Sequence, residues 1–145
     1  MITYRFLQKH EVTQDMVRQV TLLAAQLSNR KRDITVSSLA LSAERSYVVL
    51  ARDGGKIIGI AALVLEYLPL GGCKSYVDDV VVDNAYRGKG VARSIMNKLI
   101  VEARIRGARK VRLTSNSSRV AARALYTSLG FVQRETGVFD LALDT

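Results

Sequence analysis

The sequence predicts one domain of the α/β (α+β) class, in which about four helices flank a central mixed, mostly antiparallel sheet of about six or seven strands. Two observations support this prediction. The expected elements follow the order β-α-α-β-β-β-α-β-α-β-β, so strands come before and between the helices. The 145 residues, 48% of them hydrophobic, are enough to bury one core, and we expect the domain to span residues 1–145.

The first elements follow from two different periods of apolar residues. Residues 2–7 alternate between apolar and polar side chains, which predicts a short strand. Residues 11–28 carry apolar side chains at helical spacing, among them Val12 and Met16, which predicts an amphipathic helix. A second, shorter helix is expected around residues 37–43.

The middle of the chain predicts three strands. Residues 46–52 and 56–67 are apolar runs separated by the turn sequence Asp-Gly-Gly, which is typical of a hairpin because glycine adopts positive φ without strain. Residues 74–83 follow a glycine-rich loop and are apolar on both sides near their end. This strand is therefore expected to be central and buried.

The last third alternates helices and strands. A helix is expected from about residue 90 to residue 106, closed by Gly107. A strand at residues 110–114 follows, and the residues 115–118 include several good N-caps for a helix that ends near Leu129. The final strands are expected at 131–134 and 138–143.

One stretch combines features of an anion site. The apolar run 80–82 ends at polar residues, and a basic loop containing Gly88 and Gly90 leads into the long helix. The first N–H groups of a helix have no intrahelical partner, and the helix dipole adds partial positive charge there. Glycine allows close approach of the backbone, and Arg87 and Lys89 add full charges. The stretch therefore predicts a diphosphate site.

Composition limits the compartment and the kinds of site. The single cysteine, Cys73, cannot form an internal disulfide, and residues 1–5 do not resemble a signal peptide. The longest apolar run, residues 57–65, is far shorter than the ~20 residues that a membrane helix needs. We therefore expect a soluble, cytoplasmic protein without a membrane partner. No cluster of histidine and cysteine predicts a metal site.

The formal net charge of +9 suits an anionic ligand, a nucleic acid or an acidic surface. The sequence contains no recognition-helix or aromatic-platform motif, and its charge is concentrated at the glycine loop, so nucleic acid is not expected as a partner. The basic run 30–32 is interpreted as a solvated loop, with contact to an anionic substrate as the alternative.

Two motifs on these elements are similar to signatures of the GNAT superfamily of N-acetyltransferases. Arg87-x-x-Gly90-x-Ala92 fits its acyl-CoA signature Gln/Arg-x-x-Gly-x-Gly/Ala, and the segment from Tyr126 to Phe131 fits its later Tyr-x-x-x-Gly-Phe signature. The resemblance covers nearly the whole chain. It implies a sheet splayed between the fourth and fifth strands, and acetyl-CoA as the acyl donor. It also implies direct transfer in a ternary complex to a primary amine on a small molecule or peptide.

The resemblance also assigns the cofactor contacts. The amides of the glycine loop would hold the pyrophosphate of coenzyme A, and the strand before it would offer backbone groups to the pantetheine arm. Arg119 stands where the family often has asparagine, so it would meet a phosphate or cap its helix instead. The implied cofactor-binding residues are Val80, Val81, Val82, Arg87, Gly88, Lys89, Gly90, Val91, Ala92 and Arg119.

The catalytic residues implied by the resemblance are Tyr126, Asp79 and Asp78. Tyr126 matches the tyrosine that protonates the leaving thiolate, although a tyrosine packed in the core is the alternative. A carboxylate must accept the proton of the amine, and Asp78, Asp79 and Glu66 are candidates. Side chains alternate along a regular strand, so only one of the two aspartates is expected to face the substrate.

The acceptor is not determined by these motifs. The paired acids resemble those of glucosamine-phosphate acetyltransferases, and Thr114, where some peptide-directed members carry an acid, disfavours amino-terminal peptides. A CoA-binding regulatory module without transferase activity is the alternative function. Members of the superfamily often form homodimers, and no sequence feature decides the oligomeric state here.

Overall fold

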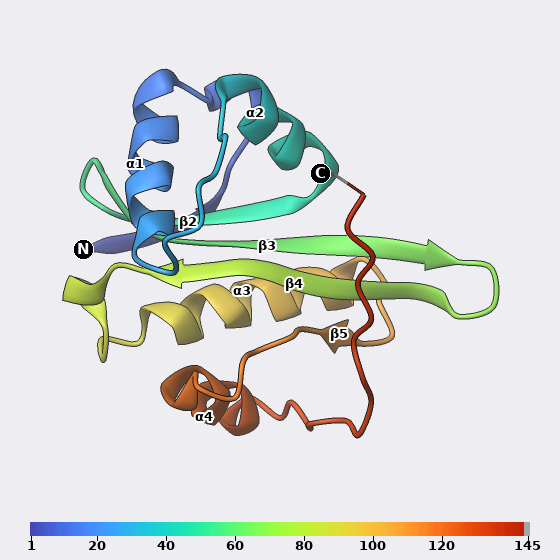
Figure 1. The fold of residues 1–145 in the computed structure, drawn as a ribbon. Coiled ribbons are helices and arrows are strands. Elements are labelled where there is room, and N and C mark those ends of the chain that lie inside the picture. Colours follow the sequence, from blue (N-terminus) through green and yellow to red (C-terminus); the bar gives the residue numbers. More distant parts are fainter. Residues whose placement is uncertain (144–145) are drawn as a thin grey trace. The chain divides into compact units, whose positions relative to one another are not determined.

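The computed structural model describes residues 1–143 and divides the chain into two compact units, Met1–Thr114 and the part that begins at Ser115 (Figure 1). The first unit contains the whole sheet, and the second contains α4 (Val120–Ser128). In chain order, the first unit is built from β1 (Ile2–Phe6), the 3-10 turn η1 (Lys9–Glu11), α1 (Gln14–Ala25), α2 (Val36–Arg45), β2 (Tyr47–Asp53), β3 (Lys56–Leu68), β4 (Gly72–Val82), the 3-10 turn η2 (Asn84–Tyr86), α3 (Val91–Ile105) and β5 (Val111–Arg112).

The sheet has the spatial order β1-β2-β3-β4-β5. The first four strands pair antiparallel with their neighbours, and β5 pairs parallel with β4 at Ser75–Val111 and Tyr76–Arg112. The α+β class, the mixed and mostly antiparallel sheet and the four α-helices predicted from the sequence are thereby confirmed. The single-domain boundary at 1–145 stays a prediction.

The number of strands differs from the prediction. The sheet of the described residues has five strands, and the expected strands at 131–134 and 138–143 are irregular backbone instead. Apart from the half-buried Phe131, their apolar side chains are exposed, as Val138 at 70% and Phe139 at 96% illustrate. Alternation of apolar residues makes a segment suitable for a strand, but a strand also needs a neighbouring backbone to pair with, and the local sequence does not supply one.

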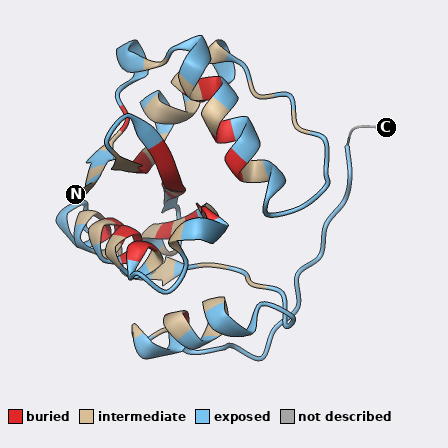
Figure 2. Ribbon diagram, turned by 90° about the vertical axis from the view of Figure 1, so that its left-hand side faces the viewer, coloured by how far each residue is buried: buried red, intermediate tan, exposed pale blue. Residues whose placement is uncertain are grey.

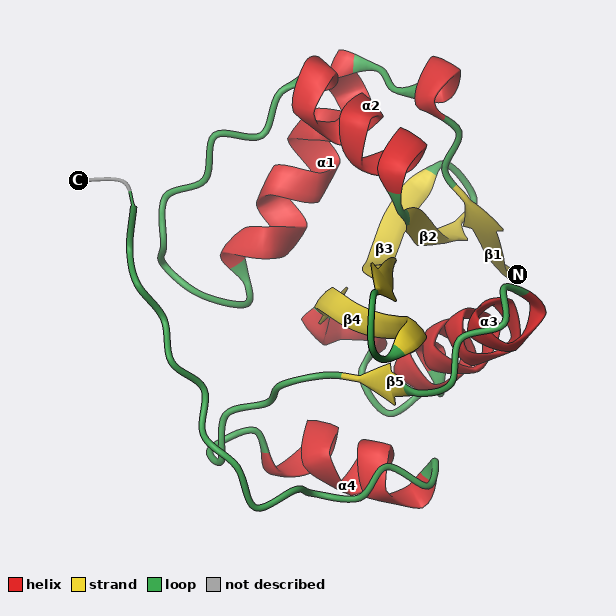
Figure 3. Ribbon diagram, turned by 90° about the vertical axis from the view of Figure 1, so that its right-hand side faces the viewer, coloured by secondary structure: helices red, strands yellow, loops and turns green. Residues whose placement is uncertain are grey.

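Two layers of helix cover the sheet of the first unit, with α1 and α2 on one face and α3 on the other (Figure 3). The sides of α1 and α3 that carry the buried residues face the strands (Figure 2). Gly59 of β3 lets α3 approach closely, because a Cβ there would lie 3.0 Å from Ile95 Cδ1. The core on the α1 and α2 face consists of Leu7, Val17, Val20, Leu23, Leu39, Val48, Leu50, Ile57, Ile60 and Val81.

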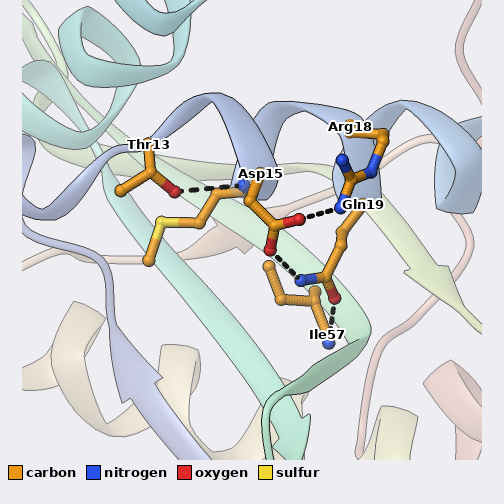
Figure 4. A network of polar contacts seen from close by, with 6 residues as sticks. Thr13, Asp15, Arg18, Gln19 and Ile57 are labelled. Carbon is orange, nitrogen blue, oxygen red and sulfur yellow. Dashed lines mark hydrogen bonds and ion pairs between the residues drawn. The ribbon is translucent and has the colours of Figure 1, made fainter.

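The first helix is attached to the sheet by a polar contact as well as by its apolar face. Thr13 caps α1 by accepting a hydrogen bond from Met16 N at 3.2 Å, so the helix begins at residue 14 and not at 11. One turn further on, Gln19 Oε1 accepts from the backbone N–H of Ile57 at 2.8 Å (Figure 4). Gln19 Nε2 donates to Asp15 at 2.8 Å, which fixes the orientation of the amide.

Replacement of Gln19 by alanine is expected to destabilise the protein by about 1–2 kcal/mol, because the partly buried N–H of Ile57 loses its acceptor. Urea unfolding of the Gln19→Ala variant measures this loss. Arg18→Ala is the matched control, since Arg18 forms only an exposed ion pair with Asp15 on the same helix, and its loss is expected to stay below about 1 kcal/mol. Equal losses in the two variants would contradict the assignment.

Candidate functional site

The glycine loop between β4 and α3 has an open backbone. Gly90 is the N-cap residue of α3 with φ of +76°, and Gly88 has the same φ. A side chain is strained at such angles, which explains glycine at both positions. A Cβ built on either residue would meet no protein atom within 4 Å. The loop therefore leaves space directly over its backbone.

The same loop presents backbone donors. Within residues 1–143, no protein group accepts a hydrogen bond from the N–H groups of Gly88 to Ala92. Among the described residues, the first turn of α3 has no acidic residue and its N-cap makes no side-chain hydrogen bond, so the helix itself does not neutralise the positive end of its dipole. Arg87 and Lys89 are exposed beside it. This arrangement fits a diphosphate, as the sequence predicted for this stretch.

Tyr86 fixes the start of the loop to the β2–β3 hairpin. Its hydroxyl donates to Asp53 Oδ2 at 2.5 Å, and this hydrogen bond raises the pKa of the Tyr86 phenol. The ammonium of Lys89 lies 5.1 Å from the centre of the Tyr86 ring, within range of a cation–π interaction. The sequence analysis did not identify Tyr86 as a supporting residue, because its partner Asp53 is distant in sequence and only the fold brings them together.

The strand before the loop is unpaired along part of one edge. In the part of the chain that the structure describes, β5 pairs with β4 only at Ser75 and Tyr76. Beyond Tyr76, the backbone of β4 that includes Val80 to Val82 is therefore not paired with β5. Such a free edge can accept an extended ligand through main-chain hydrogen bonds, as another strand would.

A β-bulge interrupts β4 at Asp79. Ile60 pairs with Val81 but Ala62 pairs with Asp78, so two residues of β4 lie opposite one residue of β3. Asp79 has φ of +58°, a left-handed conformation that is uncommon for residues other than glycine. The strand is not regular here, so the alternation argument that placed Asp78 and Asp79 on opposite faces does not apply.

The two carboxylates differ in their surroundings. Asp78 Oδ1 accepts a hydrogen bond from the backbone N–H of Asp79 at 2.8 Å. Partial burial raises the pKa of the Asp79 carboxyl, and the negative charge of Asp78 raises it further, while Arg32 and Arg30 oppose the shift. The Asp79 carboxylate is therefore more easily protonated than an ordinary aspartate, and it lies near enough to Arg30 and Arg32 for their positive charges to lower its pKa.

The basic run has a structural role as well. The guanidinium of Arg32 donates to Ala24 O at 3.3 Å in the last turn of α1, to Arg30 O at 3.1 Å and to Ser28 Oγ at 3.0 Å. It thereby adds a further donor to the Ala24 carbonyl, which also accepts from Leu27 N, and holds the loop between α1 and α2 together. Arg30 and Lys31 are exposed, as expected of a solvated loop, whereas Arg32 is half-buried by these contacts.

The second unit carries the remaining predicted site residues. Tyr126 of α4 is only 9% exposed, and its ring lies 5.9 Å from that of Phe131. Burial raises the pKa of the Tyr126 phenol, and the charge of Arg119 opposes this. Arg119 occupies the N-cap position of α4 without a side-chain cap hydrogen bond, since a guanidinium has no acceptor. The capping alternative for its side chain is therefore not realised.

Neither a metal cluster nor a membrane-spanning helix is found in the described part of the chain. Among residues 1–143, no group of three or more histidine, cysteine, aspartate or glutamate side chains is arranged to hold a metal ion. The described helices include none that is both long and apolar enough to cross a bilayer.

The acetyltransferase (GNAT) family model matches residues 14–131. N-acetyltransferase family 8 member 2 of Rattus norvegicus is 31% identical over 112 residues, which cover 77% of this chain and 47% of that protein. Glucosamine 6-phosphate N-acetyltransferase of Trypanosoma brucei brucei is 32% identical over 83 residues, which cover 56% of this chain and 54% of that protein. The chain spans about half the length of these curated relatives.

Solved structures agree on the fold. An aminoglycoside acetyltransferase from an uncultured soil metagenomic sample has a TM-score of 0.86 to this chain, with 20% sequence identity, and the match covers 99% of both chains. At this identity the likeness shows the fold alone.

Proposed function

Because the chain belongs to the acetyltransferase (GNAT) family, we propose that it is an acetyl-CoA-dependent N-acetyltransferase that acts on a primary amine in a ternary complex. Acetyltransferases of this family use acetyl-CoA as donor. The observation that carries the proposal is the glycine loop, whose N–H groups from Gly88 to Ala92 have no protein acceptor within the described residues and whose surface is open.

In this proposal the loop from Arg87 to Ala92 binds the pyrophosphate of acetyl-CoA, with Arg87 and Lys89 as charge partners. The free edge of β4 at Val80 to Val82 pairs with the amides of the pantetheine arm. A phosphate bound by backbone N–H groups at a helix N-terminus needs no specific side chain. The side chains of Arg87 and Lys89 then add affinity, and the hydrogen bond from Tyr86 to Asp53 holds the start of the loop rigid. Arg119 remains a candidate for a further phosphate contact.

We assign the general base to Asp79 and give Asp78 a positioning role. An alkylammonium of pKa ~10 must lose a proton before its nitrogen attacks the thioester carbonyl. The carboxylate of Asp78 accepts the N–H of the bulge, so it maintains the backbone conformation of Asp79. The raised pKa of Asp79 makes it a better proton acceptor than an ordinary aspartate.

Tyr126 is proposed as the general acid. When the carbon–sulfur bond of the thioester breaks, the thiolate of coenzyme A takes up a proton, and a phenol can supply it. Burial raises the pKa of Tyr126, so the residue is fully protonated at neutral pH, as a proton donor must be.

Localisation in the cytoplasm, formation of a homodimer and the lack of a nucleic-acid partner stay predictions from the sequence.

The acceptor is proposed to be a small amine. The relative from Trypanosoma brucei brucei carries the name glucosamine 6-phosphate N-acetyltransferase, and an amino sugar of this size suits a site formed around two carboxylates. Thr114, which follows β5, provides no third acid for a peptide amino terminus.

Two measurements test the function. Acetyl-CoA at saturation should raise the melting temperature, because a ligand that binds only the folded state stabilises it. Release of free thiol with a panel of amines then tests the transfer. No thermal shift with acetyl-CoA would overturn the cofactor assignment. A clear shift without thiol release from any amine would favour the regulatory module instead.

Gly90→Ala is expected to weaken acetyl-CoA binding by about tenfold or more, which corresponds to about 1.4 kcal/mol, because the Cβ enters the space over the loop. Gly107→Ala is the matched control. Gly107 follows the other end of α3, has φ of +78° and also has no protein atom within 4 Å of a built Cβ. Both variants carry similar backbone strain, so a tenfold loss in both would argue against a specific role of Gly90.

Tyr126→Phe is expected to lower kcat by about a hundredfold while the affinity for acetyl-CoA stays nearly unchanged, because only the proton donor is lost. Steady-state kinetics and a binding titration separate the two effects. Tyr67→Phe serves as control, since Tyr67 is 74% exposed in the first unit. Unchanged turnover in Tyr126→Phe would remove Tyr126 from the mechanism.

Asp79→Asn is expected to raise the melting temperature at pH 7 while lowering kcat by about a hundredfold. The folded pKa of Asp79 lies above its unfolded value, so the ionised carboxylate reduces stability at neutral pH. This penalty is relieved as the pH falls through the folded pKa, and it is absent below 3.8, the ordinary pKa of an aspartate, where the group is protonated in both states. The stabilisation by asparagine should therefore shrink as the pH falls from 7 towards 4.

Thermal unfolding across this pH range measures the expected stabilisation, and the pH dependence of kcat/KM measures the expected loss of turnover. Asp140→Asn is the control for the loss of one negative charge, because Asp140 is exposed in the irregular segment that follows α4. A lower melting temperature for Asp79→Asn at pH 7, or wild-type turnover, would contradict the assignment of Asp79 as the base.

A further inference from the structure

A small depression lies on the sheet of the first unit near the end of the β3–β4 hairpin, apart from the glycine loop. Its volume is about 50 Å³, more than a single water molecule needs. Three of its lining residues are cations, contributed by β4, by β5 and by the residue before β5. The lining consists of Glu66, Leu68, Lys74, Ser75, Tyr76, Lys110 and Arg112.

Strand register places this depression on the same face as Asp78. Lys74 pairs with Glu66, and Asp78 pairs with Ala62, and the strands are regular between these two positions. Lys74, Tyr76 and Asp78 therefore point to one side of β4. Ala62 packs against the core on the α1 and α2 face, so this side is the one that α1 and α2 cover further along the sheet.

The depression carries excess positive charge. Among the described residues that line it, Glu66 is the one carboxylate, against the cations Lys74 and Arg112. Among residues 1–143, no ion pair within 4.0 Å joins Glu66, Lys74 or Arg112 to an opposite charge. Lys74 is folded over the hairpin loop, because a Cβ on Gly71 would lie 3.0 Å from its Nζ.

The polar groups beside these cations suit an oxyanion. Arg112 pairs in register with Tyr76, so both side chains leave the sheet at the same level. The hydroxyl of Tyr76 lies 3.1 Å from Thr114 Oγ1, and this contact fixes the position of the phenol. A guanidinium binds two oxygens of a phosphate at once, while the ammonium of a lysine acts as a point charge, so the two types complement each other.

We propose that this depression binds a phosphate group carried by the acceptor amine, with Arg112 and Lys74 as its main partners. The inference rests on the N-acetyltransferase function proposed above. At ~3.3 Å per residue, Tyr76 and Arg112 lie about 7 Å along β4 from Asp78, and Lys74 lies about 13 Å away. An amino-sugar phosphate or a short aminoalkyl phosphate spans a distance of this order. Its amine then reaches the two aspartates while its phosphate occupies the depression.

The first test uses binding alone, with glucosamine 6-phosphate and glucosamine as probes in the presence of coenzyme A. The phosphorylated probe should raise the melting temperature of the wild-type protein more than glucosamine does. Arg112→Gln should remove this difference, and Lys74→Gln should reduce it. Arg104→Gln is the matched control, because Arg104 is an exposed residue of α3 on the other face of the sheet. Loss of the difference in Arg104→Gln as well would overturn the assignment.

The second test uses turnover. Wild-type kcat/KM should favour the phosphorylated amine by about tenfold or more, as expected for charge-assisted hydrogen bonds. Arg112→Gln should abolish this preference by lowering kcat/KM for the phosphorylated amine far more than for glucosamine. Inorganic phosphate should compete with the phosphorylated acceptor in the wild type. Competition that persists unchanged in Arg112→Gln would place phosphate binding elsewhere and overturn the proposal.

The outcomes separate this inference from the function on which it rests. Equal use of the two amines, with thiol release from both, would overturn the phosphate subsite and leave the acetyltransferase function intact. Thiol release from no amine would overturn the function. The difference in melting temperature between the two probes would then still decide whether the depression binds phosphate.

Discussion

The arrangement of the first unit depends on the unequal pairing of β4. One edge of this strand is joined to β3 along most of its length, whereas the other edge meets β5 at only two residues, Ser75 and Tyr76. The unpaired part ends in the glycine loop, and the bulge at Asp79 interrupts the paired edge just before it. A fully paired β4 would leave no main-chain groups for a ligand and no irregular position for a carboxylate.

Such open features cost stability, and their neighbours offset that cost. The left-handed backbone at Asp79 is strained, and the carboxylate of Asp78 stabilises it by accepting the N–H of the bulge. The glycine loop leaves N–H groups without acceptors in the described part of the chain, while the hydrogen bond from Tyr86 to Asp53 holds its start in place. The strain is thereby confined to the residues proposed to bind and react.

Sequence reasoning predicted the backbone correctly where the signal is local. The loop from Gly88 to Gly90 needs only glycine, charge and the start of a helix, all of which are adjacent in the chain. It failed where a partner decides the structure. Residues 138–143 have the composition of a strand, yet no backbone within residues 1–143 pairs with them. The bulge at Asp79 follows from the register against β3, which no local pattern encodes. The roles of Tyr126 and the aspartates stay predictions.

The distribution of charge on the α1 and α2 face of the sheet supports a bipolar acceptor. Asp78 and the adjacent bulge supply negative charge, which attracts an ammonium group, and the depression around Arg112 supplies positive charge a short distance along the same strand. A simple alkylamine would complement only the first of these, and a plain phosphate only the second. A molecule that carries both an ammonium and a phosphate group complements the negative and the positive region at once. Its length must match the distance along the strand between Tyr76 and Asp78. In such a site the distance between opposite charges, rather than the shape of a deep pocket, determines which amines bind.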